Sequence, residues 1–287
     1  MTLRDPPGER SPADRLAFGV VNLDKPAGPS AHQVAAWLRD LAGVERAAHA
    51  GTLDPKVTGC LPVLLGTATR AAMALDGATK EYVAVLELHA DPPADLAGVL
   101  AEFEGPIHQK PPRRSAVVRR LRTREVYALD AVDRDGRQVL LRVRCAPGTY
   151  VRKLCHDLGL ALGTGAHMGD LRRTATGHFD DTDLVSLHDV ADGLARARET
   201  GEDDWLREAV QPAERALAAL PAVTVARSAA REVANGAPVY APGVLDVGGA
   251  GGGPPPEPGG SAVCLGRLVG DPDAEEGTVV DLERVLV

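Results

Sequence analysis

The segment from His49 to Arg70, HAGTLDPKVTGCLPVLLGTATR, decides the fold, because a loop that holds one acid leads directly into an apolar run. Glycines and a proline surround Asp54 and disfavour a helix or strand there. The apolar residues Leu61 to Leu65 would anchor the loop from beneath. The pattern predicts an exposed, fixed loop that presents Asp54. An aspartate before a proline is also common in turns, so a catalytic role needs support from other segments.

A strand and a helix are predicted before this loop. Val20 to Leu23 is a short apolar run that ends at a Lys-Pro turn, which is typical of a strand. The residue pair Pro29-Ser30 then opens a helix. Apolar residues follow at positions i, i+3, i+4 and i+7, which predicts one apolar helix face. These residues are Val34, Trp37, Leu38 and Leu41.

Two strands and a second helix are predicted after the loop. Tyr82 to Leu88 is apolar on both faces, like a covered central strand. Val139 to Cys145 alternates apolar residues with arginines, like a half-exposed strand. Val151 to Leu162 has the apolar spacing of a helix that stops near Gly163. Because strands and helices mix without a regular βαβ repeat, we expect an α+β fold.

The composition changes along the chain and suggests domain boundaries. Residues 1–15 are polar and Pro-rich, which predicts a disordered tail. A main domain is expected over residues 16–219, ending in helical sequence from about Leu187. Residues 220–287 are rich in Val, Gly and Pro with short strand-like runs, which predicts a small β domain. Within it, Gly248 to Gly260 cannot build a core and predicts a flexible loop.

The overall composition narrows the class of protein. The chain has 287 residues, 44% of them hydrophobic, enough for a sizeable core. It has no apolar run long enough for a membrane span and no signal-peptide core, so we expect a cytoplasmic protein. The cysteines form no C-x-x-C pair and no zinc spacing, which predicts free thiols and no metal site. They are Cys60, Cys145, Cys155 and Cys264.

The charge balance is acidic. A net charge of −8 argues against nucleic-acid binding. However, most basic residues are arginines and the acids are scattered. An acidic, Lys-poor, Ala-rich surface predicts a halophilic protein, whose nucleic-acid binding could not depend mainly on counterion release. Arginine clusters, hydrogen bonds and shape would have to provide it. The lysines are Lys25, Lys56, Lys80, Lys110 and Lys153.

Two further segments carry candidate functional residues. Tyr150 and Arg152 follow a glycine turn where a strand passes into a helix, so both can border a pocket. Tyr82 opens its predicted strand. It is either a core residue or, in a chain with 3% aromatic residues, a stacking surface. The sequence suggests that Leu171 is a core residue and that the two arginines after it are solvated.

Together these segments resemble the TruB group of pseudouridine synthases. Within it they are similar to the archaeal and eukaryotic dyskerin type, the catalytic subunit of box H/ACA ribonucleoproteins. The resemblance covers most of residues 19–179 and implies a pseudouridine synthase fold with a mixed, largely antiparallel sheet. Residues 220–245 are similar to the start of a PUA domain, a small RNA-binding pseudo-barrel. The motifs are NLDKPAGPSAHQVAAWLR (22–39), HAGTLDPKVTGCLPVLLGTATR (49–70), KEYV (80–83), QKPPRRSAV (109–117) and GTYVRKLCHDLG with GAHMGDLRRT (148–174).

The resemblance also implies a role for each matching residue. Asp54 matches the essential aspartate, Tyr82 the tyrosine that stacks on the target base, and Arg152 the arginine that pairs with the carboxylate. Tyr150 matches the tyrosine beside that arginine, Leu171 a residue lining the uracil pocket, and His49 a histidine near the flipped nucleotide. Lys25 and Pro26 match a motif that braces the catalytic loop.

The implied reaction turns uridine into pseudouridine, in rRNA through an H/ACA guide RNA, in tRNA at uridine 55, or in both. The C1′–N1 bond is broken and the base rejoins through C5, so no cofactor or metal is implied. A carboxylate with a reference pKa of about 3.9 is ionised at neutral pH. A neighbouring Arg152 would hold it ionised and oriented.

Four interpretations remain open. The chain between Ser115 and Tyr150 is too short for the extra basic segment of stand-alone enzymes, which favours a guide-dependent enzyme. The resemblance then implies three small partner proteins: a kink-turn binder, a small zinc- or strand-type protein and a β-barrel protein. The alternatives are a stand-alone tRNA pseudouridine-55 synthase, a non-catalytic RNA-binding scaffold for ribosome assembly, and an aspartate-nucleophile hydrolase.

Overall fold

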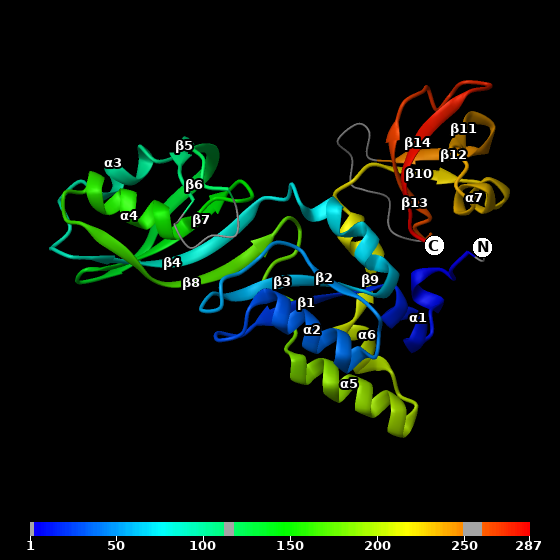
Figure 1. Ribbon diagram of the computed structural model, residues 1–287, viewed down its shortest axis with the longest axis horizontal. Helices are drawn as coiled ribbons and strands as arrows, with labels where there is room; N and C mark the ends of the chain where they lie inside the picture. Colours follow the sequence, from blue (N-terminus) through cyan, green and yellow to red (C-terminus); the bar gives the residue numbers. More distant parts are fainter. Residues whose placement is uncertain (1–2, 112–117, 249–259) are drawn as a thin grey trace.

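A computed structural model describes residues 3–111, 118–248 and 260–287. Most of the predicted 248–260 loop and the end of the QKPPRRSAV motif lie outside these ranges. The molecule is elongated (Figure 1): an outer lobe with helices α3 (Leu96–Ala101) and α4 (Val151–Ala161) lies at one end and a C-terminal β unit at the other. The loop that carries Asp54 belongs to the central part between them.

One mixed sheet runs through the outer lobe and the central part. Its strand order is β5-β6-β7-β4-β8-β3-β1-β9, with β2 added to β3. Every pairing is antiparallel except that of β3 with β8, which joins the two halves through Thr58 and Gly59 opposite Arg172 and Arg173. The predicted mixed, largely antiparallel sheet of an α+β fold is confirmed. The strands are β1 Gly19–Lys25, β2 Ala47–His49, β3 Thr58–Leu65, β4 Lys80–Leu88, β5 Gly105–Gln109, β6 Arg122–Asp135, β7 Gln138–Cys145, β8 Ala166–Thr176 and β9 Gln211–Pro212.

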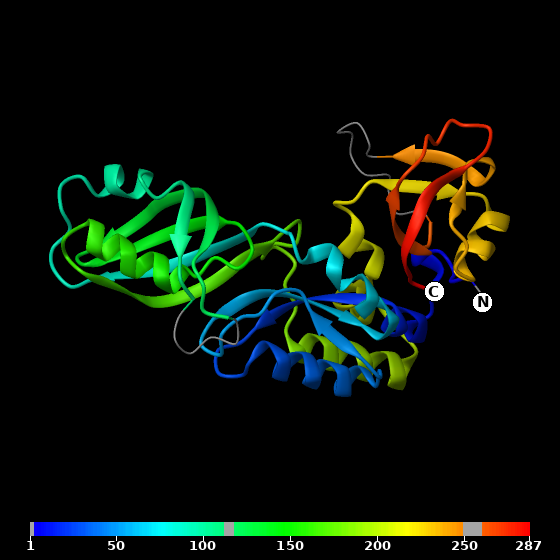
Figure 2. The same ribbon diagram turned by 45° about the horizontal axis from the view of Figure 1, so that its top comes forward.

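The helices of the central part cover one face of this sheet. Helices α2 (Ala31–Ala42) and α5 (Leu187–Thr200) lie side by side beneath β1 and β3 (Figure 2). The hydroxyl of Ser30 accepts a 3.1 Å hydrogen bond from the Gln33 amide and caps α2, as predicted. Placing Trp37 on the buried face was wrong, since its side chain is 45% exposed. Small alanines face the sheet in its place.

The remaining sequence predictions for this part are mostly confirmed. Strand β7 alternates buried and exposed residues, and α4 buries the predicted apolar residues. Strand β4 was expected to be covered on both faces, but its residues alternate between buried and half-buried. Only one face of β4 packs into the core. The segment predicted as helical from Leu187 holds α5, α6 (Asp204–Ala209) and a 3-10 turn, Ala213–Leu217.

The prediction of a disordered tail over residues 1–15 is wrong for residues 3–15. They form a 3-10 turn, Pro7–Glu9, and enter helix α1 (Pro12–Ala17). Arg10 is fully buried and donates bidentate hydrogen bonds of 2.8 and 2.6 Å to the Glu214 carboxylate. The polar composition suggested disorder because the partner of Arg10 lies about two hundred residues away in the sequence.

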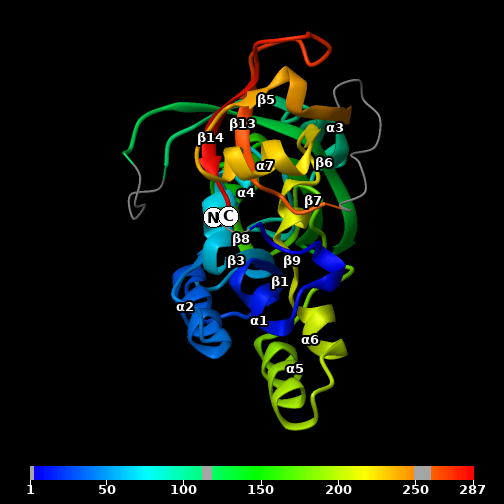
Figure 3. The same ribbon diagram turned by 90° about the vertical axis from the view of Figure 1, so that its right-hand side faces the viewer.

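In residues 220–248 and 260–287 the C-terminal unit holds two small sheets and one α-helix. Its core is formed by valines from α7, β11 and β14. The unit docks on the N-terminal segment, where Arg10 bonds the Ser261 hydroxyl and Glu214 accepts from the Ala262 amide. Figure 3 shows the two termini beside each other there. The sheets are β10 (Ala222–Val225) with β12 (Val244–Gly248), and β11 (Val239–Tyr240) with β14 (Thr278–Val285) and β13 (Cys264–Leu268); the helix is α7 (Arg227–Ala234).

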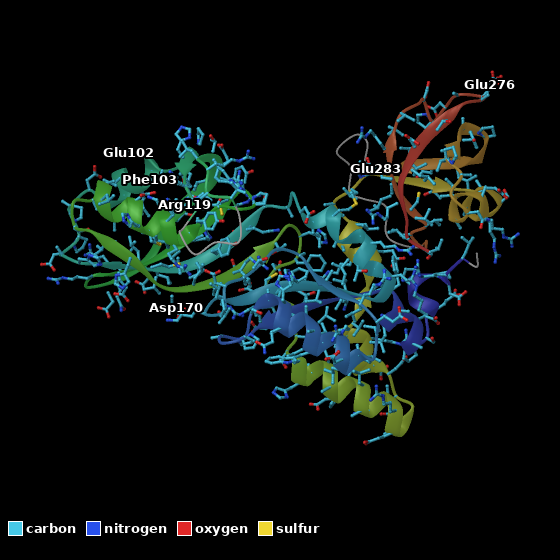
Figure 4. All side chains as sticks on the ribbon, viewed as in Figure 1. Glu102, Phe103, Arg119, Asp170, Glu276 and Glu283 are labelled. Carbon is cyan, nitrogen blue, oxygen red and sulfur yellow. The ribbon has the colours of Figure 1, made fainter. Side chains whose placement is uncertain are left out.

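Acidic side chains lie at both ends of the molecule. Figure 4 shows Glu102 on the outer lobe and Glu276 and Glu283 on the C-terminal unit. This agrees with the scattered acids of the sequence. Within the described ranges, no helix has the length and apolar character needed to cross a membrane.

Candidate active site

The loop between β2 and β3 presents Asp54 to solvent. The Asp54 side chain is 56% exposed, while Leu53 and Val57 on either side are buried in the main core. The Asp54 carbonyl accepts a 3.0 Å hydrogen bond from the Val57 amide and closes a tight turn. The predicted exposed and anchored loop is therefore present.

Lys25 fixes the shape of this loop from below. Its ammonium group is buried and donates to the carbonyl oxygens of Pro26 (2.8 Å), Pro55 (3.1 Å) and Val57 (2.8 Å). Burial lowers the pKa of Lys25, and the nearby Asp54 carboxylate partly opposes that shift. The contacts expected of a bracing Lys-Pro motif are present.

Arg152 reaches Asp54 from the outer lobe. Its Nη2 lies 2.5 Å from Oδ2 of Asp54, and the two side chains are 55% and 56% exposed. Arg152 lies in the first turn of α4, which starts after Tyr150. The buried Gln109 fixes this start, since its amide accepts from the Tyr150 N–H (2.9 Å) and donates to the Tyr150 carbonyl (3.2 Å). The pair is accessible to a substrate and is held from both sides.

Tyr82 and Leu171 lie together on the buried face shared by β4 and β8. Ala84 is opposite Leu171, and Tyr82 is opposite Arg173 in the same register. Residues two apart on a strand share a face, so Tyr82 and Leu171 are diagonal neighbours. Burial raises the pKa of Tyr82, whereas Arg173 acts in the opposite direction. Tyr82 and Leu171 therefore form one apolar patch on this face.

His49 lies at the other end of the loop, on β2. Its ring packs edge-on against His32 with 4.6 Å between centroids, and its pKa is lowered mainly by burial. The structure thus places it against α2, whereas Asp54 is paired with Arg152. The four cysteines are free thiols, as predicted. In the described ranges, no three His, Cys, Asp or Glu side chains gather as metal ligands would.

Two basic residues near the loop were missed by the sequence analysis. Arg173 was grouped with solvated charge, but it is buried, as is Lys80. Only Arg172 fits that expectation, pairing with Asp24 at 3.0 and 3.1 Å. The alternation of side chains along a strand was the available signal, because two consecutive arginines in a strand must face opposite sides.

Lys80→Met is expected to stabilise the fold by up to about 3 kcal/mol at pH 7. Burial, followed by the charge of Arg173, lowers the pKa of Lys80 from 10.5 to about 8. Below pH 8 the folded protein carries the buried charge. Between pH 8 and 10.5 the unfolded chain binds more protons, so wild-type stability rises and the advantage of the variant should disappear. Urea unfolding from pH 7 to 10 measures this difference. Lys56→Met, at an exposed position, is the control and should show no such window.

The family resemblance implies that Tyr82 stacks on the target base. On that role Tyr82→Leu should lower turnover tenfold to a hundredfold, since base stacking on an aromatic ring contributes roughly 1–3 kcal/mol. The affinity for RNA should fall much less, because contacts to the phosphate backbone supply much of the binding free energy of RNA-binding proteins. Single-turnover rates at saturating RNA and a filter-binding Kd separate the two effects. Tyr82→Phe keeps the ring and should retain more activity than the leucine variant. Equal rates for Tyr82→Leu and wild type would exclude Tyr82 from the site.

Comparison with known proteins places this geometry in a family. Residues 39–97 match the N-terminal domain of TruB family pseudouridylate synthases, and residues 152–218 the tRNA pseudouridylate synthase B C-terminal domain. Residues 5–35 match the DKCLD (NUC011) domain. These matches include the segments that carry Lys25, Asp54, Tyr82 and Arg152.

Whole-chain relatives agree with this match. A probable tRNA pseudouridine synthase B of Halobacterium salinarum is 68% identical over the full length of both chains. One of Haloarcula marismortui is 63% identical over all of this chain and 94% of its own. A crystal structure of a Cbf5-Nop10-Gar1 complex gives a TM-score of 0.89 at 43% identity, covering 99% of this chain and 90% of the other. An H/ACA RNP bound to a substrate RNA containing 2′-deoxyuridine gives 0.89 at 41%, with the same coverage.

The fold is that of a pseudouridine synthase, an isomerase that converts uridine in RNA. The chain belongs to the TruB family of pseudouridylate synthases, in its archaeal, Cbf5-like branch. The hydrolase and scaffold alternatives are therefore set aside.

Proposed function

We propose that Asp54 is the nucleophile of this enzyme and that Arg152 keeps it ionised and oriented. The observation that carries the proposal is the 2.5 Å contact between these side chains on an exposed, braced loop. The carboxylate attacks C1′ as the C1′–N1 bond breaks, and the released uracil rotates. C5 then attacks C1′ as the bond to Asp54 breaks, after which C5 loses its proton to solvent and N1 takes one up. Tyr82 and Leu171 receive the flipped base, and Tyr150 and His49 border the substrate.

The enzyme acts on a substrate presented by an H/ACA guide RNA. The structural relatives support this, since one is a complex with Nop10 and Gar1 and another an H/ACA RNP with substrate RNA. The C-terminal β unit serves as a PUA-like anchor for the guide, and small ribonucleoprotein proteins complete the assembly. The relatives at 68% and 63% identity come from halophilic organisms. Together with the net charge of −8, this supports an enzyme adapted to high salt.

A second candidate is modification of tRNA uridine 55 without a guide. The names of the curated relatives favour it, because they are described as probable tRNA pseudouridine synthases B. The two activities use the same Asp54 chemistry and differ only in how the uridine is delivered.

A tritium-release assay with 5-tritiated uridine distinguishes these possibilities. Target RNA is supplied with a guide RNA and partner proteins, and unmodified tRNA is supplied to the protein alone, both at high salt. Release only in the first reaction supports guide dependence, and release in the second supports the tRNA activity. No release in either reaction would overturn the proposed function.

A further inference from the structure

Two buried basic side chains lie behind the loop that carries Asp54. Arg173 on β8 and Lys80 on β4 are 1% and 5% exposed. Neither has a carboxylate partner among the ion pairs of the described residues. Because burying an unpaired charge is costly, this arrangement is not explained by stability.

The Arg173 guanidinium connects three separate segments. Its Nε donates to the carbonyl of Cys60 on β3 at 2.7 Å, and its Nη2 donates to the carbonyl of Gly51 at 3.2 Å, with Ala50 at 3.5 Å. Across the β4–β8 pairing it lies opposite Tyr82, and its positive charge opposes the rise in the pKa of Tyr82 that burial causes. A single side chain thus bonds the start of the loop that carries Asp54 and lies opposite the tyrosine expected to stack on the base.

The loop backbone packs closely on this group at Gly51. Gly51 has a φ of +85°, a region that favours glycine. A Cβ there would lie 3.3 Å from Nη1 of Arg173 and 3.4 Å from Cε of Lys80. The loop therefore rests on Arg173, with Lys80 filling the space beside it.

We propose that Arg173 is a positioning residue, which sets the distance between the catalytic loop and Tyr82 so that the flipped uracil meets the Asp54 carboxylate. This inference rests on the proposed roles of Asp54 and Tyr82. Arg173 acts through the backbone of residues 50–51, whereas Arg152 contacts the carboxylate itself. Arginine suits this position because its planar group holds five donors in a fixed arrangement. The single ammonium of lysine cannot reach all these acceptors at once.

A double-mutant cycle tests the coupling. Arg173→Lys keeps the charge and loses the geometry, while Tyr82→Phe keeps the ring and removes the hydroxyl, and with it the electrostatic link to Arg173. We expect Arg173→Lys to lower the single-turnover rate at saturating RNA at least tenfold, with the Kd for RNA changed less than about twofold. The double variant should be no slower than Arg173→Lys alone, because the link is already broken. Arg142→Lys, on the exposed face of β7, is the matched control and should retain the wild-type rate.

If the rate losses of the two single variants multiply in the double variant, the inference is wrong. A loss in Arg173→Lys that is confined to RNA affinity would also overturn it. If Arg173→Lys does not fold, as judged by its melting temperature, Gly51→Ala tests the same contact from the exposed loop. It should slow single turnover while leaving the Kd unchanged, and a wild-type rate in this variant would also overturn the inference. An inactive wild-type protein would instead contradict the proposed function. An active wild type with an inactive Asp54→Asn and an unaffected Arg173→Lys would contradict this inference alone.

Discussion

Asp54→Asn should abolish pseudouridine formation, with a loss on the order of 10⁴-fold or more, or at least about 5 kcal/mol of transition-state stabilisation. Asparagine has nearly the same shape as aspartate but is uncharged and a poor nucleophile. The exposed side chain contributes little to the core, so the fold should be retained. Tritium release under single-turnover conditions measures the rate, and a Kd for target RNA within a few-fold of wild type would show that binding is retained.

The matched control for this prediction is Asp130→Asn. Asp130 on β6 also pairs with an arginine, Arg142, at 2.9 Å, and the two side chains are similarly exposed. It lies far from the loop in sequence and should affect turnover by less than twofold. Comparable losses in the two variants would mean that Asp54 acts through general surface electrostatics, and its role as nucleophile would be rejected.

Glu214→Gln should destabilise the protein by about 3–5 kcal/mol, the usual cost of leaving a buried charge without its partner. The Glu214 carboxylate accepts two guanidinium hydrogen bonds from Arg10 and one from the Ala262 amide. Its loss should therefore also loosen the docking of the C-terminal unit. Urea unfolding measures the stability, and faster amide exchange near residue 262 would report the docking.

Two comparisons make this second prediction specific. Glu283→Gln breaks the exposed pair of Glu283 with Arg267 and should cost at most about 1 kcal/mol. Replacing both members of the buried pair, Arg10→Met with Glu214→Leu, should recover much of the lost stability because no unpaired charge remains. Equal costs for Glu214→Gln and Glu283→Gln would show that the buried pair is not a significant anchor.

The sequence predicted those features that depend on local patterns. Alternation along β7, the apolar spacing of α4 and the serine cap of α2 each depend on residues a few positions apart, and each is present. The exposed loop around Asp54 followed from its glycines and proline. Its pairing with Arg152 came from the family resemblance, because spacing alone cannot bring together residues 98 positions apart.

The features that were missed depend on distant partners. Arg10 looked like part of a disordered tail because Glu214 is remote in the sequence. Arg173 looked solvated because its acceptors are backbone carbonyls, which leave no mark in the sequence. Trp37 was placed on the buried face of α2 by spacing, whereas alanines on that helix fit closer to the sheet. Composition and periodicity cannot identify such contacts.

The parallel pairing between β3 and β8 has a consequence for how the chain folds. It joins residues more than a hundred positions apart, so its formation requires closing a very long loop, which is slow. Asp54 lies on the loop before β3, whereas Tyr82 and Arg152 lie in the long segment between β3 and β8. The β3–β8 pairing brings this segment alongside the loop. Activity should therefore return in the slowest phase of refolding, later than the secondary structure of either half.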